Sequence, residues 1–99
     1  MPRGRWRCPR WINAMPPAPM FRPMGVPIIN VVTLHVEELE AMRLADLEGL
    51  EQEEAAKRMG VSRKTLWTDL KSARKKVAYA LVNGYAIEIR GGSYLMARR

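Results

Sequence analysis

Residues 52–83 have the sequence QEEAAKRMGVSRKTLWTDLKSARKKVAYALVN, in which Gly60 separates two runs whose apolar residues have helical spacing. Glycine readily adopts the left-handed backbone conformation that a short turn between two helices needs. Ser62 follows, and its hydroxyl can accept a hydrogen bond from a free backbone N–H at the start of the next helix. The stretch therefore predicts a short helix over 51–59, a tight turn, and a long helix over 63–83.

Apolar side chains predict how these two helices pack. Ala55 and Ala56 are small enough to let the helices approach closely where they cross, and Val61 can fill the angle between them. At about 100° per residue, five apolar side chains of the long helix fall within about 80° and form the expected buried stripe: Leu66, Leu70, Ala73, Val77 and Ala80. Two crossed helices joined by a sharp turn are typical of a helix-turn-helix.

The opposite face of the long helix is polar and basic. Arginine and lysine can reach guanine edges or phosphates, and the major groove of DNA admits an α-helix. We expect residues 62–82 to form a recognition helix in that groove, with Arg74 and Lys75 meeting the DNA backbone. The expected contact residues are Ser62, Arg63, Lys64, Thr65, Trp67, Thr68, Lys71, Arg74 and Lys75.

Two side chains of this helix leave alternatives open. Trp67 lies on the basic face and either touches a thymine methyl or sugar, or packs against another helix or a partner subunit. Asp69 borders the buried stripe, and we expect it at the rim, where Lys76 is a distant candidate partner.

The segment before the turn is acidic. Apolar residues from Val36 to Leu50 have helical spacing, and His35 is the expected N-cap, with Glu38 reaching back to it. The simplest account of the acids is a solvated face: Glu37, Glu38, Glu40, Glu48 and Glu51. The leucines exceed one narrow stripe, so part of this surface is a candidate for pairing with a second copy in a homodimer: Leu39, Leu44, Leu47 and Leu50.

Residues 1–30 have a different composition. All seven prolines lie here, together with five arginines and no acid, which predicts an extended arm. Its arginines either follow phosphates or enter a minor groove, or the arm is a surface segment. The apolar run 28–34 and the alternating run 86–90 predict short strands, which we expect to pair.

These elements together predict a mainly α fold: a three-helix helix-turn-helix with an extended arm and short flanking strands. We expect an arm over 1–30, a DNA-binding domain over 31–94 and a tail over 95–99.

Composition bounds the function. The chain has 99 residues and a net charge of +7, which favours a polyanionic partner. Cys8 is the one cysteine, so an internal disulfide is excluded; it is either a redox-sensing or intermolecular metal-binding thiol, or an incidental one. No apolar run approaches the roughly 18 residues of a membrane span. We expect a soluble cytoplasmic protein with no cofactor or metal, and no pattern of an enzyme active site is present.

Long segments resemble a known family. Residues 37–50, 52–63, 72–78 and 91–94 look like the small prokaryotic proteins catalogued as domain of unknown function 134, and Arg7-Cys8 and 21–27 resemble that family's N-terminal segment. The resemblance covers nearly the whole chain. It implies a helix-turn-helix similar to region four of bacterial sigma factors and a DNA-binding role. The sequence departs from the family pattern at His35 and at 67–69.

Two functions are therefore expected as rivals. The first is a sequence-specific DNA-binding transcriptional regulator, which binds double-stranded DNA through the basic helix. The second is a protein-interaction module that contacts RNA polymerase or another part of the transcription machinery through Trp67 and the acidic helix.

Overall fold

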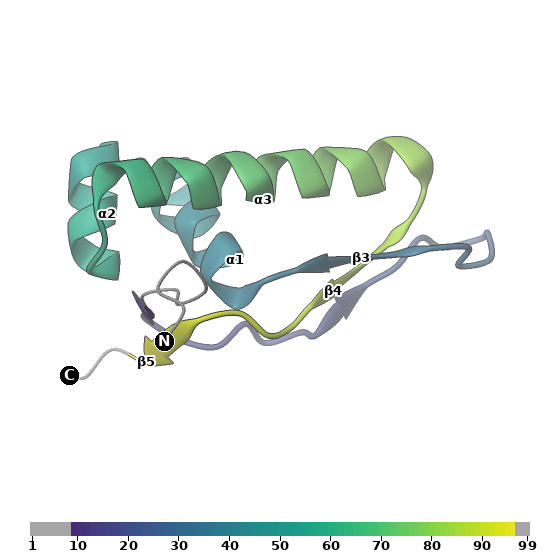
Figure 1. The fold of residues 1–99 in the computed structure, drawn as a ribbon. Helices are drawn as coiled ribbons and strands as arrows, with labels where there is room; N and C mark the ends of the chain where they lie inside the picture. The colour runs from purple at the N-terminus through teal and green to yellow at the C-terminus, as the bar shows by residue number, and fades with distance from the viewer. Residues whose placement is uncertain (1–8, 97–99) are drawn as a thin grey trace, which may run out of the picture.

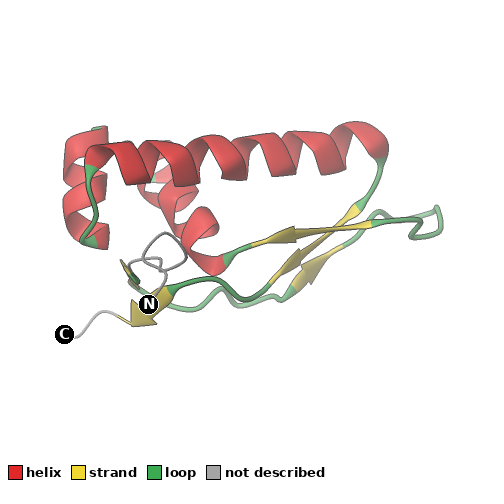
Figure 2. Cartoon of the chain, viewed as in Figure 1, coloured by secondary structure: helices red, strands yellow, loops and turns green. Residues whose placement is uncertain are grey.

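The computed structural model describes residues 9–96 and shows a small α/β domain. The helices are α1 (Val36–Met42), the π-helical turn η2 (Arg43–Leu47), α2 (Gln52–Met59) and α3 (Arg63–Asn83). The strands are β1 (Arg10–Ile12), β2 (Met20–Phe21), β3 (Val31–Leu34), β4 (Ala86–Ile89) and β5 (Tyr94–Met96). The predicted mainly α fold is wrong, because these strands form two sheets on which the helices pack (Figure 2).

The larger sheet has the order β2-β4-β3 and lies below α3 (Figure 1). β3 and β4 are parallel, in a register from Val31 opposite Ala86 to Leu34 opposite Ile89, which confirms the predicted pairing of these two runs. Parallel strands need a long crossover, and here all three α-helices form it. β2 adds an antiparallel strand to the other side of β4.

The smaller sheet joins the two ends of the described chain. β1 and β5 are parallel, with Arg10 opposite Tyr94 and Ile12 opposite Met96. Neither strand was expected from the sequence. Each has three residues, which is too short for an alternating pattern to identify a strand.

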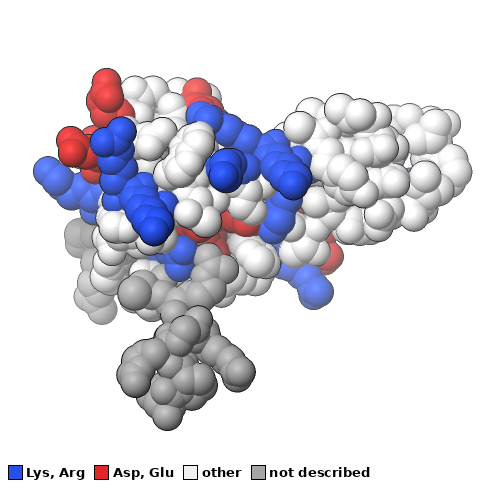
Figure 3. Space-filling model, turned by 45° about the horizontal axis from the view of Figure 1, so that its top comes forward, with Lys and Arg blue, Asp and Glu red and all other residues white. Residues whose placement is uncertain are grey.

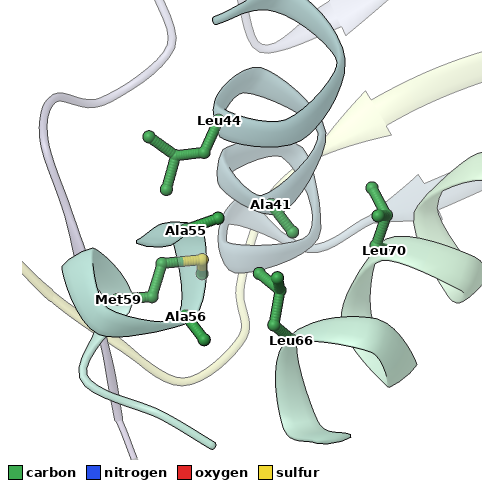
Figure 4. Close-up of a cluster of buried hydrophobic side chains, with 7 residues drawn as sticks. All are labelled: Ala41, Leu44, Ala55, Ala56, Met59, Leu66 and Leu70. Carbon is green, nitrogen blue, oxygen red and sulfur yellow. The ribbon is translucent and has the colours of Figure 1, made fainter. Parts of the chain in front are cut away.

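The buried apolar residues form two clusters. The first lies between the helices and contains Ala41, Leu44, Ala55, Ala56, Met59, Leu66 and Leu70 (Figure 4). The second lies between α3 and the strands and contains Ile12, Leu34, Val36, Ala73 and Ile89. The predicted stripe of α3 is confirmed: Leu66, Leu70, Ala73 and Ala80 are buried, and Val77 packs against the second cluster.

The π-helical turn changes which side chains face the core. The N–H of Glu48 donates to the carbonyl of Arg43 at 2.8 Å, five residues back, so the turn holds one residue more than an α-helical turn. Leu44 is therefore buried, whereas Leu47 is 77% exposed. A regular helical period cannot predict this shift.

Three glutamates of α1 are buried, so the expected solvated face is wrong for them. Glu37, Glu38 and Glu40 are at most 6% exposed. Each accepts hydrogen bonds from elsewhere in the chain: Glu37 from the N–H of Ser93, Glu40 from the N–H of Asn13 and from the Arg43 guanidinium, and Glu38 from three groups.

Asp69 is also buried and lies in an ion pair with Arg10 of β1. Arg10 Nε donates to Asp69 Oδ2 at 2.9 Å, and Nη2 donates to Oδ1 at 3.1 Å. The expectation of an Asp69 at the rim near Lys76 is wrong, because the partner comes from a strand 59 residues away. The pair joins the N-terminal segment to the middle of α3.

We expect Asp69→Ala to lower the free energy of unfolding by about 3–5 kcal/mol, because it leaves the buried Arg10 without its carboxylate. The double variant Arg10→Met, Asp69→Leu removes both charges and should recover most of that loss. Urea denaturation followed by circular dichroism measures both. Glu54→Ala is the control, because Glu54 forms an exposed pair with Arg58 and should cost at most about 0.5 kcal/mol. A loss for Asp69→Ala no larger than the control's contradicts the prediction.

Glu38 joins α1 to α3. Its carboxylate accepts from Ser72 Oγ at 2.6 Å, from Lys76 Nζ at 2.8 Å and from the N–H of His35 at 2.9 Å, which confirms that Glu38 reaches back to the N-cap. Burial alone would raise the pKa of Glu38, but these bonds together hold the pKa below its usual value.

The lowered pKa of Glu38 predicts a pH-dependent contribution to stability. The ionised carboxylate stabilises the fold above the pKa of the unfolded chain, about 4.3, and this contribution is lost as the pH falls through the lower pKa of the folded state. We therefore expect Glu38→Gln to destabilise the protein at about pH 7 and to cost much less at about pH 3. Urea unfolding at both pH values tests this against the exposed control Glu53→Gln. A cost for Glu38→Gln that does not change with pH contradicts it.

Candidate nucleic-acid interface

The turn between α2 and α3 has the predicted geometry. Gly60 has φ of 69° and ψ of 32°, in the left-handed region, and the N–H of Val61 donates to the carbonyl of Ala56 at 3.0 Å. A Cβ on residue 60 would lie 2.7 Å from Trp11 Cδ1 of β1. Residue 60 must therefore be glycine for two reasons: its backbone is left-handed, and Trp11 leaves no room for a Cβ.

Ser62 is the N-cap of α3, as predicted. Its Oγ accepts a hydrogen bond from the N–H of Thr65 at 3.1 Å and donates to Thr65 Oγ1 at 3.1 Å. These bonds fix the first turn of α3. They also occupy part of the hydrogen-bonding capacity of both hydroxyls, so Ser62 and Thr65 have less left for a ligand.

α3 presents a continuous outer face on the side away from the sheet. Of the nine predicted contact residues, Thr65 is half-buried and the other eight are exposed. Figure 3 looks onto this side and shows lysine and arginine side chains over the half of the molecule that contains α2 and the first turns of α3. The structure therefore brings the predicted residues together on one surface. We call the set Arg63, Lys64, Lys71 and Lys75 the basic face.

The basic face carries uncompensated positive charge. In the range 9–96, no carboxylate lies within ion-pair distance of Arg63, Lys64, Lys71 or Lys75. Asp69, the acid of α3, points inward to Arg10. The helix thus exposes cations and buries its one anion.

Arg74 differs from the other cations. Its Nε and Nη2 donate to the two carboxylate oxygens of Asp46 on η2, at 3.1 and 2.6 Å. The bonds from Arg74 hold the pKa of Asp46 below its usual value. Both side chains are nearly half exposed, so the pair is accessible to solvent. Arg74 lies on the predicted surface but with its charge locally balanced.

Trp67 lines a shallow hollow at the start of α3. The hollow has a volume of about 420 Å³ and is lined by Gln52, Arg63, Lys64 and Trp67. Trp67 is 40% exposed, so part of its ring is accessible to a ligand. The hollow brings an aromatic ring, an amide and two cations within reach of one ligand.

Two residues of this surface were missed by the sequence interpretation. Gln52 is the first residue of α2, the helix that precedes the turn at Gly60. The helical spacing of the sequence could have identified this position. Asp46 could not have been found, because it reaches Arg74 only through the π-helical turn and across 28 residues.

The described part of the N-terminal segment contains two arginines in different surroundings. Arg10 is buried in the pair with Asp69, and Arg22 is exposed next to β2. Arg3, Arg5, Arg7 and Cys8 lie outside the described residues, as does the end of the predicted tail. In the described part of the chain, no helix combines the length and apolar character needed to span a bilayer, and no three potential metal ligands cluster.

Comparisons with known proteins give a consistent result. The family model described as "Protein of unknown function DUF134" matches residues 1–97. A UPF0251 protein of Methanosarcina acetivorans is 58% identical over 97 residues, which are 96% of this chain and 87% of that protein. A UPF0251 protein of Thermoanaerobacter pseudethanolicus is 56% identical over 87 residues, covering 86% of this chain and 74% of the relative. No solved structure matches.

Some relatives are much longer. A second UPF0251 protein of Methanosarcina acetivorans is 52% identical over 88 residues, but the chain spans only 52% of its length.

Proposed function

The chain belongs to the DUF134 family of proteins of unknown function. We propose that this protein is a sequence-specific DNA-binding protein that regulates transcription. In this proposal α2, the turn and α3 act as a helix-turn-helix, with the first turns of α3 in the major groove. The observation that carries it is the basic face, whose four cations have no carboxylate partner within 9–96.

Three features support DNA over another polyanion. The basic side chains follow one face of a single exposed helix, which matches the width of the major groove. The sharp turn at Gly60 sets α3 against α2, so the start of α3 stands free of the sheet. Gln52, at the start of α2, can reach a phosphate beside the groove.

The roles of the contact residues differ in this proposal. Near the start of α3, Arg63 and Lys64 meet base edges and phosphates, and Trp67 and Thr68 meet base edges and sugars. Lys71, Arg74 and Lys75 meet phosphates further along. Ser62 and Thr65 chiefly hold the helix start in place, because their hydroxyls already bond each other.

About five phosphate contacts should give a slope of log K against log salt near −4.5. We expect Arg63→Ala, Lys64→Ala to weaken binding to duplex DNA at least tenfold and to flatten the slope by about 1 for each phosphate that the variant no longer binds. Fluorescence anisotropy over a salt series measures both.

Arg22→Ala, Arg90→Ala is the matched control for that double variant. It removes the same charge from two exposed arginines that lie off α3 and should leave binding nearly unchanged. Equal losses of affinity for the two double variants would show that only net charge matters and would reject the assigned groove contact. Capture of purified RNA polymerase without any shift of DNA would instead favour the interaction module.

Asp46→Asn provides a second test, because it releases the guanidinium of Arg74. We expect tighter DNA binding, by about 3- to 10-fold at low salt, and a slope steeper by about 1. The cost in stability should be small, since the pair is exposed. Arg74→Ala added to Asp46→Asn should abolish the gain. Unchanged binding by Asp46→Asn would show that Arg74 does not meet DNA.

A further inference from the structure

One end of the molecule exposes an unusual number of large apolar side chains. They come from the segment between β2 and β3, from the strand ends beside it, and from the last turns of α3. We call this surface the apolar tip: Phe21, Met24, Val26, Ile29, Val31, Tyr79, Leu81 and Val82. Leu81 is 72% exposed, Val82 is 83% exposed and Met24 is 88% exposed, so these residues contribute little to the core of the monomer.

The apolar tip is structurally connected. The N–H of Ala86, just after α3, donates to the carbonyl of Asn30, just before β3, at 3.0 Å. The rings of Tyr79 and Tyr85 are in edge contact, with centroids 5.4 Å apart. The end of α3 and the segment before β3 are thereby held together, and in Figure 3 they form the white end of the molecule.

The same end carries little charge, although Arg22, next to Phe21, is exposed. Residues 23–34 and 77–87 contain no lysine, arginine, aspartate or glutamate, in a chain whose net charge is +7. Depletion of charge together with aromatic and methionine side chains is the composition of an interface core.

We propose that the apolar tip is the interface through which two copies of this chain form a symmetric dimer. At about 200 Å² for each fully exposed residue of this size, the exposed fractions amount to roughly 1,000 Å² over all sides of the apolar tip. A standard protein interface buries about 800 Å² per partner, so a dimer of that size would enclose most of the tip. Soluble monomers rarely expose apolar patches of more than a few hundred Å².

Charge argues for a second copy as the occupant. Two chains of net charge +7 repel each other, and the apolar tip is where they can meet with few cations brought together. A nucleic acid would need cations that this surface does not have. A two-fold interface is self-complementary, so one apolar surface is sufficient for both partners.

The geometry leaves the basic face free. Arg63 and Val82 are 19 positions apart on one straight helix, which places them about 28 Å apart along its axis. A dimer formed at the tip therefore exposes the starts of both α3 helices at its far ends. The inference does not rest on DNA binding, and its test contains no DNA.

The experiment is sedimentation equilibrium of the full chain, without nucleic acid, over a range of protein concentrations. The monomer mass is 11.3 kDa, and we expect wild type to approach twice that value. Leu81→Glu, Val82→Glu places like charges across the proposed interface and should weaken dimerisation by about 100-fold or more. Circular dichroism checks that the variant keeps its helix content, as the exposure of both side chains predicts.

Leu47→Glu is the matched control. Leu47 is 77% exposed on η2, nearly the same as Leu81, and it is one of the leucines whose spacing in the sequence favours self-association. We expect Leu47→Glu to dimerise as wild type does. Wild type that stays monomeric at its highest soluble concentration overturns the proposal. So does a dimer that Leu47→Glu disrupts and the tip variant does not.

Discussion

The ion pair between Arg10 and Asp69 is the constraint on which the arrangement of the chain depends. A carboxylate in the middle of α3 can be buried only if a cation reaches it, and that cation comes from β1. Placing Arg10 there aligns β1 with β5 and brings Trp11 against the turn at Gly60. The N-terminal segment thus packs against the helical unit, which is residues 35–85, and it supports the turn between α2 and α3 from outside.

Burial of acids also explains how a chain with ten acidic residues presents a basic surface. Glu37, Glu38 and Glu40 point inward from α1, and Asp69 points inward from α3. Lys76, Arg43 and Arg10 compensate Glu38, Glu40 and Asp69, respectively. Glu37 accepts a hydrogen bond from the N–H of Ser93. The cations of the basic face then remain available to a partner. The distribution of charged residues between core and surface therefore determines the basic surface more than the net charge of the chain does.

The helical unit was predictable because its signals are local. Gly60, Ser62 and the spacing from Leu66 to Ala80 specify a turn, a cap and a buried stripe within a few residues of one another. The fold class was not predictable, since β1 and β5 are three-residue strands that exist only by pairing with each other. The buried glutamates were missed for the same reason: Glu38 finds Ser72 and Lys76 more than thirty residues away. For the candidate nucleic-acid interface, helical periodicity located the outer face of α3. It did not locate Gln52 or the ion pair between Arg74 and Asp46.

The parallel pairing of β3 with β4 has a kinetic consequence. The whole helical unit, residues 35–85, lies between these two strands, and β1 and β5 join residues near the two ends of the described chain. Closing such large loops costs chain entropy before any strand contact compensates for it. Contacts between α2 and α3 close a far shorter loop. We expect the helices to assemble early and both sheets to close late, with a folding rate slower than that of an all-helical bundle of the same size.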